Sequence, residues 1–222
     1  SNQALEGLRL QGARDAYEEY LDRLRIHVIE RRPEMPIDYN ITDMVADYET
    51  AVGELTEAPF DLLGIAGGGL MALRYAARNP EKVRRLLLLS SGYRMSETGR
   101  RLLEDWSEAA ERLQWRRVNS SFMKSMFANP LAGWFFAGIA YLVPETLGVS
   151  DYPWDFIVGN RAVAAADCRE DAGRIRAPTL ALTGAHDRFF TPDVVRETAE
   201  LTANGEAVVY PKEGHGLFKA QK

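Results

Sequence analysis

The sequence predicts an α/β fold in which a mostly parallel central sheet is flanked by helices and carries an inserted helical cap. Short apolar segments alternate with helical segments near both ends of the chain, which is typical of parallel sheets with crossover helices. Four consecutive leucines at 86–89 are typical of a strand that is buried on both faces. The middle of the chain is aromatic-rich and helical in pattern, which indicates an insertion between two strands.

The first part of the chain is expected to alternate helices with strands. An apolar stripe formed by Tyr17, Tyr20, Leu21 and Leu24 predicts the first helix. In order, we expect a helix at 13–24, a strand at 25–29, a helix at 41–55 capped by Thr42, a strand at 60–65, a helix at 68–79 and a strand at 83–89.

This alternation stops after the leucine-rich strand and resumes only near the end of the chain. Residues 93–167 are therefore assigned to the cap, and residues 1–92 and 168–222 to a discontinuous core. After the cap, we expect a strand at 177–184, a helix at 193–202 capped by Thr191 with Pro192 in its first turn, and a strand at 207–210.

The composition argues against several classes of function. A net charge of -5 without a long basic run argues against a nucleic-acid partner. The longest apolar stretch, 131–143, is too short to span a bilayer, and no secretory signal opens the chain. We therefore expect a cytoplasmic protein with no membrane partner. One cysteine, Cys168, and three histidines argue against a metal centre, and no cofactor is expected.

The segment LLGIAGGGLMA, Leu62–Ala72, joins an apolar run to a helical segment through a glycine-rich turn. Such a turn can bind phosphate, present a nucleophile or simply allow close packing. Phosphate binding is disfavoured, because no Lys-Ser/Thr pair follows the glycines and the Gly-x-Gly-x-x-Gly spacing is not met. A nucleophile-presenting turn reads Gly-x-Ser-x-Gly, and here the serine position is Ala66.

Two later strand ends carry residues that cooperate in nucleophilic catalysis. Asp187 follows the strand that ends at Gly184, and His215 lies between two glycines just after the last strand. Functional groups of parallel sheets collect beyond the carboxyl ends of the strands. A histidine can take the proton of a serine hydroxyl at neutral pH, and a buried carboxylate can orient that histidine.

Other residues compete less well for these roles. Asp171 and Asp193 are alternatives to Asp187, which we favour because it lies in the loop at a strand end. His186 is expected at the surface or in a pocket wall, and His27 in the core. Ser90 or Ser91 is a less favoured substitute nucleophile, because no elbow-type glycine pattern surrounds them.

The order of nucleophile position, acid and histidine resembles that of the α/β-hydrolase superfamily, in the branch that has a helical cap. The resemblance runs through RIHVIERRP, YNITDMVADYETAV, FDLLGIAGGGLMALRYAARNPEKVRRLLLLSS, IRAPTLALTGAHDRFFTP and VVYPKEGHGLF. It implies an α/β-hydrolase fold with Ala66 in the nucleophile position, His215 as the base and Asp187 as its orienting acid. It also implies an oxyanion hole, in which Gly67 and, from an early loop, Leu8 are the candidate donors.

The resemblance sets further expectations. Few apolar residues precede Gly7, and the chain ends at Lys222, so we expect the family's N-terminal strands and last helix to be missing. Trp134, Phe135 and Tyr141 of the cap are expected to line the pocket of a small, apolar or aromatic substrate. The sequence leaves open whether the chain forms a homodimer.

Three functions are consistent with these patterns. The favoured interpretation is a serine hydrolase with a deliberate Ser-to-Ala change at Ala66, acting on a small, largely apolar ester, thioester, amide or carbon–carbon bond. Such a chain is inactive at the acylation step. In the second, Ala66 is natural and Asp187 with His215 forms a general base of lyase, cyclase or oxygenase type. The third is a non-catalytic protein that binds a small molecule.

Overall fold

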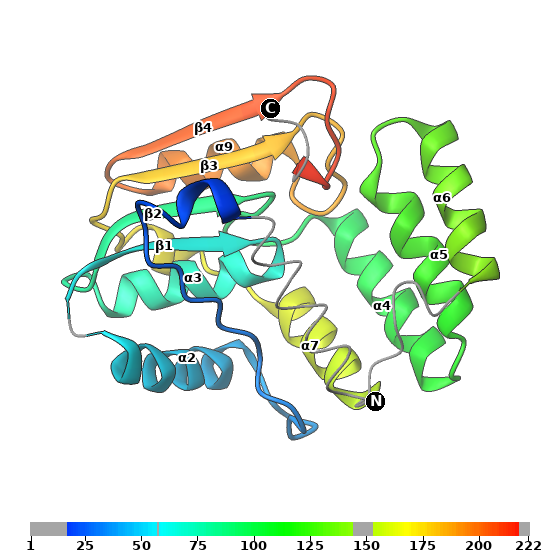
Figure 1. The fold of residues 1–222 in the computed structure, drawn as a ribbon, viewed down its shortest axis with the longest axis horizontal. Helices are drawn as coiled ribbons and strands as arrows, with labels where there is room; N and C mark the ends of the chain where they lie inside the picture. Colours follow the sequence, from blue (N-terminus) through cyan, green and yellow to red (C-terminus); the bar gives the residue numbers. More distant parts are fainter. Residues whose placement is uncertain (1–16, 57, 144–152, 218–222) are drawn as a thin grey trace. The chain divides into compact units, whose positions relative to one another are not determined.

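A computed structural model of the chain describes residues 17–56, 58–143 and 153–217 (Figure 1). The chain divides into two compact units, residues 1–31 and residues 32–222. The described part of the first unit contains one short 3-10 helix, η1 (Glu18–Tyr20). All the other helices and strands described below belong to the second unit.

Of the two predictions for the first unit, the helix at 13–24 is confirmed only in part within the described residues, because Tyr17 is helical and η1 follows it, and the strand at 25–29 is wrong. Beyond η1, the predicted helix at 13–24 continues only as a turn, and its residues 13–16 lie outside the described part. Short isolated helices are marginal in water, and Tyr20, Leu21 and Leu24 are exposed. The predicted strand at 25–29 is not formed, because a strand needs a paired neighbour and the described sheet does not include these residues.

A four-stranded parallel sheet forms the centre of the second unit, in the order β1-β2-β3-β4. The strands are β1 (Phe60–Ile65), β2 (Val83–Leu89), β3 (Thr179–Gly184) and β4 (Gly205–Tyr210). Leu86 and Leu88 are fully buried, as the leucine run predicts. The register aligns Ile65, Leu89 and Leu182, so the carboxyl ends of the first three strands reach the same edge of the sheet.

Helices α3 (Gly67–Arg78) and α9 (Pro192–Leu201) pack on this sheet, and α2 (Ile41–Leu55) packs against α3 (Figure 1). The short helix α8 (Arg169–Ala172) follows the α4–α7 segment described below. Helix α3 packs on β1 and β2, α9 packs on β3 and β4, and α8 contacts both helices. The strand order advances in one direction, so right-handed crossovers bring α3 and α9 to the same face.

The prediction that Thr42 caps α2 is wrong. Asn40, and not Thr42, is the N-cap: its side chain accepts a hydrogen bond from the Thr42 N–H at 2.8 Å, and Asp43 completes a capping box. Asparagine in extended conformation before a helix satisfies an otherwise unpaired N–H group, which fixes the start of α2.

Helices α4 (Glu97–Glu111), α5 (Trp115–Met126), α6 (Pro130–Leu142) and α7 (Pro153–Ala165) lie between β2 and β3 in the chain. Where this segment leaves and rejoins the sheet region, Arg94 forms an antiparallel bridge with Asp167, and the Cys168 N–H donates to the Tyr93 carbonyl at 2.8 Å. The boundaries 93 and 167 of the cap stay a prediction. Among the described residues, no helix is long and apolar enough to cross a membrane.

Candidate active site

The glycine turn holds Ala66 in a backbone conformation that non-glycine residues rarely adopt. Ala66 directly follows β1 and precedes α3, with φ 48° and ψ -125°. Its N–H donates to the Leu89 carbonyl at 2.9 Å, and its own carbonyl accepts from the Gly69 N–H at 3.0 Å. Such a conformation costs about 1–3 kcal/mol, so it persists only where the surrounding structure over-determines it.

Close packing explains why glycines surround this turn. A Cβ on Gly64 would lie 2.5 Å from the Gly69 Cα and 2.7 Å from the Ala72 Cβ. A Cβ on Gly69 would lie 2.0 Å from the Ser91 hydroxyl oxygen. These two glycines therefore let α3 start directly against β1 and against the end of β2.

Asp187 is held in one orientation by the loop that follows β3. Its carboxylate is buried, and its Oδ1 accepts from the N–H groups of Phe189 at 2.8 Å and Phe190 at 3.0 Å. The Thr183 hydroxyl lies 3.2 Å from Oδ2. These donors satisfy a buried carboxylate that would otherwise be costly, and they fix the direction of its second oxygen.

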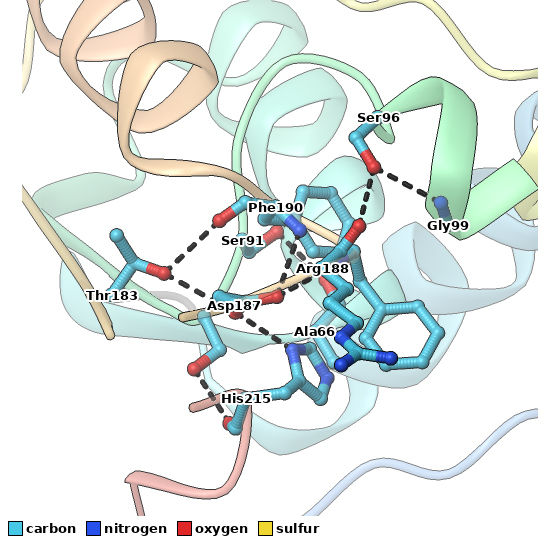
Figure 2. Close-up of polar contacts among 11 residues, drawn as sticks. Ala66, Ser91, Ser96, Gly99, Thr183, Asp187, Arg188, Phe190 and His215 are labelled. Atoms are coloured by element: carbon cyan, nitrogen blue, oxygen red, sulfur yellow. Dashed lines mark hydrogen bonds and ion pairs between the residues drawn. The ribbon is translucent and has the colours of Figure 1, made fainter. Parts of the chain in front are cut away.

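His215 contacts that second oxygen. Its Nδ1 lies 2.8 Å from Asp187 Oδ2 (Figure 2). The ring is buried, and its centroid lies 4.6 Å from that of Phe189 and 6.3 Å from that of Phe190. A carboxylate only accepts hydrogen bonds, so Nδ1 carries the proton and the lone pair of a neutral imidazole lies on Nε2. This tautomer is the one that a general base requires.

Two serines connect the glycine turn with the histidine loop. Ser90 and Ser91 follow β2, which lies between β1 and β3 in the sheet. The Ser91 hydroxyl donates to the Ala66 carbonyl at 2.7 Å, and the Ser90 hydroxyl donates to the His215 carbonyl at 2.8 Å. The structure therefore brings Ala66, Asp187 and His215 to one edge of the sheet (Figure 2).

The α4–α7 segment touches this edge in several places, two of which involve glycines beside the candidate site residues. The Gly216 N–H donates to the Met126 carbonyl at 3.2 Å, at the end of α5. A Cβ on Gly67 would lie 3.0 Å from a methyl group of Val163 in α7. Gly67 is the first residue of α3, so its N–H has no partner within that helix.

The competing residues lie in other surroundings. Asp171 forms an ion pair with Arg74 at 2.8 Å, and the Asp193 side chain is almost fully exposed beside Arg196. His186 is exposed, as expected for a surface residue. His27 is also exposed, so its predicted place in the core is wrong, because the strand that would have buried it is not formed.

The remaining candidates divide between the described and the undescribed parts. Cys168 is buried, and this burial raises the pKa of its thiol to about 12, so it is no nucleophile at neutral pH. Leu8, the second candidate oxyanion donor, lies outside the described residues. Among the described residues, no group of three or more histidine, cysteine, aspartate or glutamate side chains could hold a metal ion.

The predicted pocket residues lie on α6 and are exposed. The exposed fractions are 62% for Trp134, 65% for Phe135 and 52% for Tyr141. The Lys124 ammonium lies 3.8 Å from the centroid of the Trp134 ring. Their part in a substrate pocket stays a prediction.

Two clefts lie away from Ala66, Asp187 and His215. One, of about 430 Å³, lies between a loop and α7, and its lining consists of Glu34, Met35, Ile37, Pro153, Trp154, Asp155 and Val158. The other, of about 620 Å³, is lined by Thr42, Arg74, Arg78, Asp167, Arg169, Glu170, Asp171 and Arg174. Neither cleft was predicted, because long-range packing forms both of them.

Sequence reasoning also missed the partners of the site residues. The site residues Asp187 and His215 are contacted by Thr183, Phe189 and Phe190. The only sequence signal for these partners is that all three lie within a few positions of Asp187. The Ser90–Ser91 pair was considered only as a source of a hydroxyl nucleophile. Its place at the end of the strand between the two loops was the available signal for a connecting role.

Comparison with known proteins places this geometry in context. A model of the alpha/beta hydrolase family matches residues 9–221. The AB hydrolase superfamily protein YisY of Bacillus subtilis (strain 168) is 25% identical over 196 residues, which cover 83% of this chain and 70% of that protein. A pimeloyl-(acyl-carrier protein) methyl ester esterase of Neisseria meningitidis serogroup B (strain H44/76) is 28% identical over 174 residues, or 73% of this chain.

The match spans 64% of that esterase, which is less than two thirds of its length. Among solved structures, MGS-M2, an alpha/beta hydrolase enzyme from a Medee basin deep-sea metagenome library, is similar with a TM-score of 0.80 and 18% identity. The similarity covers 94% of this chain and 79% of that one. At this level of identity, it shows the fold alone.

Proposed function

Because the chain belongs to the α/β-hydrolase family, we propose that it carries the framework of a serine hydrolase with alanine in the nucleophile position. In this proposal, Ala66 marks the place of the nucleophile, His215 is the base and Asp187 orients it. The esterase among its relatives favours ester hydrolysis as the reaction.

The strained conformation of Ala66 carries this proposal. A methyl group makes no use of a backbone with φ 48°, whereas a hydroxyl there would project from the start of α3. Asp187 and His215 are in contact at 2.8 Å at the same edge of the sheet. This contact supports the proposed roles of Asp187 as acid and His215 as base, and in the proposal the missing group is the hydroxyl that would supply the attacking oxygen.

The chemistry with serine at position 66 follows from these contacts. His215 Nε2 would accept the hydroxyl proton while the oxygen attacks the carbonyl carbon of an ester, and Asp187 would stabilise the imidazolium. The Gly67 N–H, at the start of α3, would donate to the oxyanion. The imidazolium would then protonate the leaving alcohol, and water would hydrolyse the acyl-enzyme by the reverse proton path. With Ala66, no acyl-enzyme forms.

The proposed substrate class rests on the composition of the cap and on one relative. Small, largely apolar esters, thioesters, amides or carbon–carbon bonds suit the aromatic helix α6, and Trp134, Phe135 and Tyr141 would contribute to the pocket wall. A methyl ester of an acyl chain is a suitable first substrate, because a relative acts on such an ester. Leu8 remains the candidate for the second oxyanion donor.

The test is to restore the hydroxyl with Ala66→Ser and treat the protein with a fluorophosphonate probe. We expect covalent labelling at residue 66, with a rate at least about 10³-fold above that of the unchanged chain. Ala66→Ser combined with His215→Ala is the matched control, because it keeps the hydroxyl and removes the base. A folded Ala66→Ser protein that does not react would refute the serine-hydrolase proposal.

A second candidate function is favoured by the hydrogen bond between Asp187 and His215, which is present although residue 66 is alanine. The pair would then act as a general base without an acyl-enzyme, in a lyase, cyclase or oxygenase type of reaction. Turnover by the Ala66 chain that disappears in His215→Ala would support this alternative. Ligand binding that survives His215→Ala, without turnover, would instead indicate a binding protein.

A further inference from the structure

The serines at the end of β2 form a direct link between the nucleophile position and the base. Ser90 and Ser91 are consecutive, so their Cα atoms lie about 3.8 Å apart. One hydroxyl donates to the carbonyl of His215 and the other to the carbonyl of Ala66 (Figure 2). We infer that Ser90 and Ser91 are positioning residues that set the distance between residue 66 and the base; this inference rests on the proposed function.

The sheet explains why this pair can reach both loops. Strand β2 pairs with β1, which leads to Ala66, and with β3, which leads to Asp187. Strand β3 in turn pairs with β4, which leads to His215. The Ala66 N–H donates to the carbonyl of Leu89 in β2, and the Ser90 N–H donates to the carbonyl of Leu182 in β3 at 2.7 Å. Backbone and side-chain bonds thus attach the end of β2 to both sides of the site.

The two hydroxyls do more than satisfy otherwise unpaired carbonyls. The Ala66 carbonyl already accepts from the Gly69 N–H, and the His215 carbonyl already accepts from the Leu217 N–H at 3.1 Å. Each serine therefore supplies a second bond to its carbonyl. Both serines are fully buried, where alanine would avoid the desolvation of a hydroxyl. The added bonds restrain the two loops.

Ser90 also has a special backbone. Its φ is 48°, in the left-handed region, so the chain turns sharply between the two serines and β2. This turn directs successive side chains to different loops. Neither hydroxyl is free to replace the missing nucleophile, because both are buried and donate to backbone carbonyls.

Hydrogen exchange on the unchanged Ala66 chain tests the link without any catalysis. Ser91→Ala is expected to speed amide exchange roughly ten-fold at residues 64–70, including the Gly69 N–H, and not at residues 214–217. Ser90→Ala is expected to speed amide exchange at residues 214–217 and not at residues 64–70. The control is Ser107→Ala: Ser107 is a buried serine of α4 whose hydroxyl donates to the Leu103 carbonyl at 2.8 Å.

Ser90→Gly separates the hydroxyl from the turn. Glycine accepts φ 48° more readily than serine, so this variant keeps the turn and removes only the bond to His215. We expect it to match Ser90→Ala in exchange at residues 214–217. If Ser90→Gly behaves like the unchanged chain, the turn is the important feature and the inference for Ser90 is wrong.

Labelling kinetics in the Ala66→Ser background test the consequence for catalysis. Ser90→Ala and Ser91→Ala are each expected to slow the maximal rate of fluorophosphonate labelling about ten-fold or more, with little change in the half-saturating probe concentration. A general loss of stability would instead lower the fraction of reactive protein, and Ser107→Ala should leave the rate unchanged.

The two arms separate this inference from the proposed function. If Ala66→Ser is not labelled, the proposed function fails, and the exchange pattern alone decides whether the serines restrain the loops. If Ala66→Ser is labelled but both serine variants react as fast as Ser107→Ala, the positioning role is overturned while the proposed function stands. If amide exchange in Ser90→Ala and Ser91→Ala matches that of the Ser107→Ala control at residues 64–70 and 214–217, the inferred link through the two serines is overturned.

Discussion

At the scale of single residues, the candidate site depends on a few close approaches between backbone and side chain. Ala66 has a positive φ in the turn where Gly64 and Gly69 allow α3 to begin close against β1 and β2. Asp187 and His215 are fixed by backbone N–H donors and by the rings of Phe189 and Phe190. The chemistry of the site is thus set by packing at the ends of strands.

The glycines at 68 and 69 are expected to differ sharply in tolerance to alanine. Gly69→Ala places a Cβ 2.5 Å from the Ser91 Cβ, which no side-chain rotation relieves, and should lower the free energy of unfolding by about 2 kcal/mol. Gly68 has open space around the same atom. Gly68→Ala should be neutral or stabilise α3 by up to about 1 kcal/mol. Urea unfolding of both variants measures this difference, and equal losses would contradict the packing described here.

At the scale of elements, one arginine connects the three helices α2, α3 and α8. Arg74 in α3 forms an ion pair with Asp171 in α8 at 2.8 Å and donates to the Thr42 hydroxyl in α2 at 3.0 Å. Both charged side chains are largely buried, with exposed fractions of 20% and 15%. Asp171 is therefore paired within the packing of these helices, which agrees with the proposal that Asp187 is the acid of the candidate site.

Removing Arg74 should lower the free energy of unfolding far more than removing an arginine of an exposed ion pair. Arg74→Met keeps the aliphatic stem but leaves the Asp171 carboxylate without its cation, and we expect a loss of about 2 kcal/mol in the free energy of unfolding. Arg100→Met is the matched control, because Arg100 pairs with Glu97 on the exposed side of α4. Its loss should stay below about 0.5 kcal/mol. Similar urea midpoints for the two variants would show that Arg74 does not hold these helices together.

At the scale of the whole molecule, Cys168 reports on the integrity of the second unit. It is the only cysteine of the chain, and its thiol lies fully buried with Sγ 3.5 Å from the Leu70 carbonyl. Burial raises the pKa of this thiol to about 12, from a model-compound value of 9.0. Because the folded state holds the thiol proton more tightly, its contribution to stability is lost as the pH rises from 9.0 towards about 12.

Alkylation of Cys168 should therefore require unfolding. Near neutral pH we expect iodoacetamide to leave the folded protein unmodified over hours and to modify it rapidly in denaturing urea. Intact-mass spectrometry against urea concentration measures the reaction, and its midpoint should coincide with that of circular dichroism. Rapid modification without urea would mean that the region around α8 opens independently of the rest of the unit.

The pattern of the sequence was sufficient for most elements of the second unit. The strands at 60–65 and 83–89 and the helix at 41–55 have the predicted bounds, because apolar periodicity and turn residues act locally. Helix α3 and β3 begin within two residues of the predicted positions. The α/β-hydrolase fold is confirmed. Local pattern failed at 21–29, where an apolar run has no partner in the described structure that stabilises a helix or a strand.

The sequence by itself determined the order of Ala66, Asp187 and His215 along the chain, on which their proposed roles rest, because residue type and strand-end position are properties of the chain. Only the tertiary structure decided that Asp187 lies 2.8 Å from His215 and that Asp171 belongs to Arg74. It also gave Ser90 and Ser91 their partners at residues 215 and 66. These contacts join residues 25 to 125 positions apart, and they exist because the register of a parallel sheet brings separate strand ends to one edge.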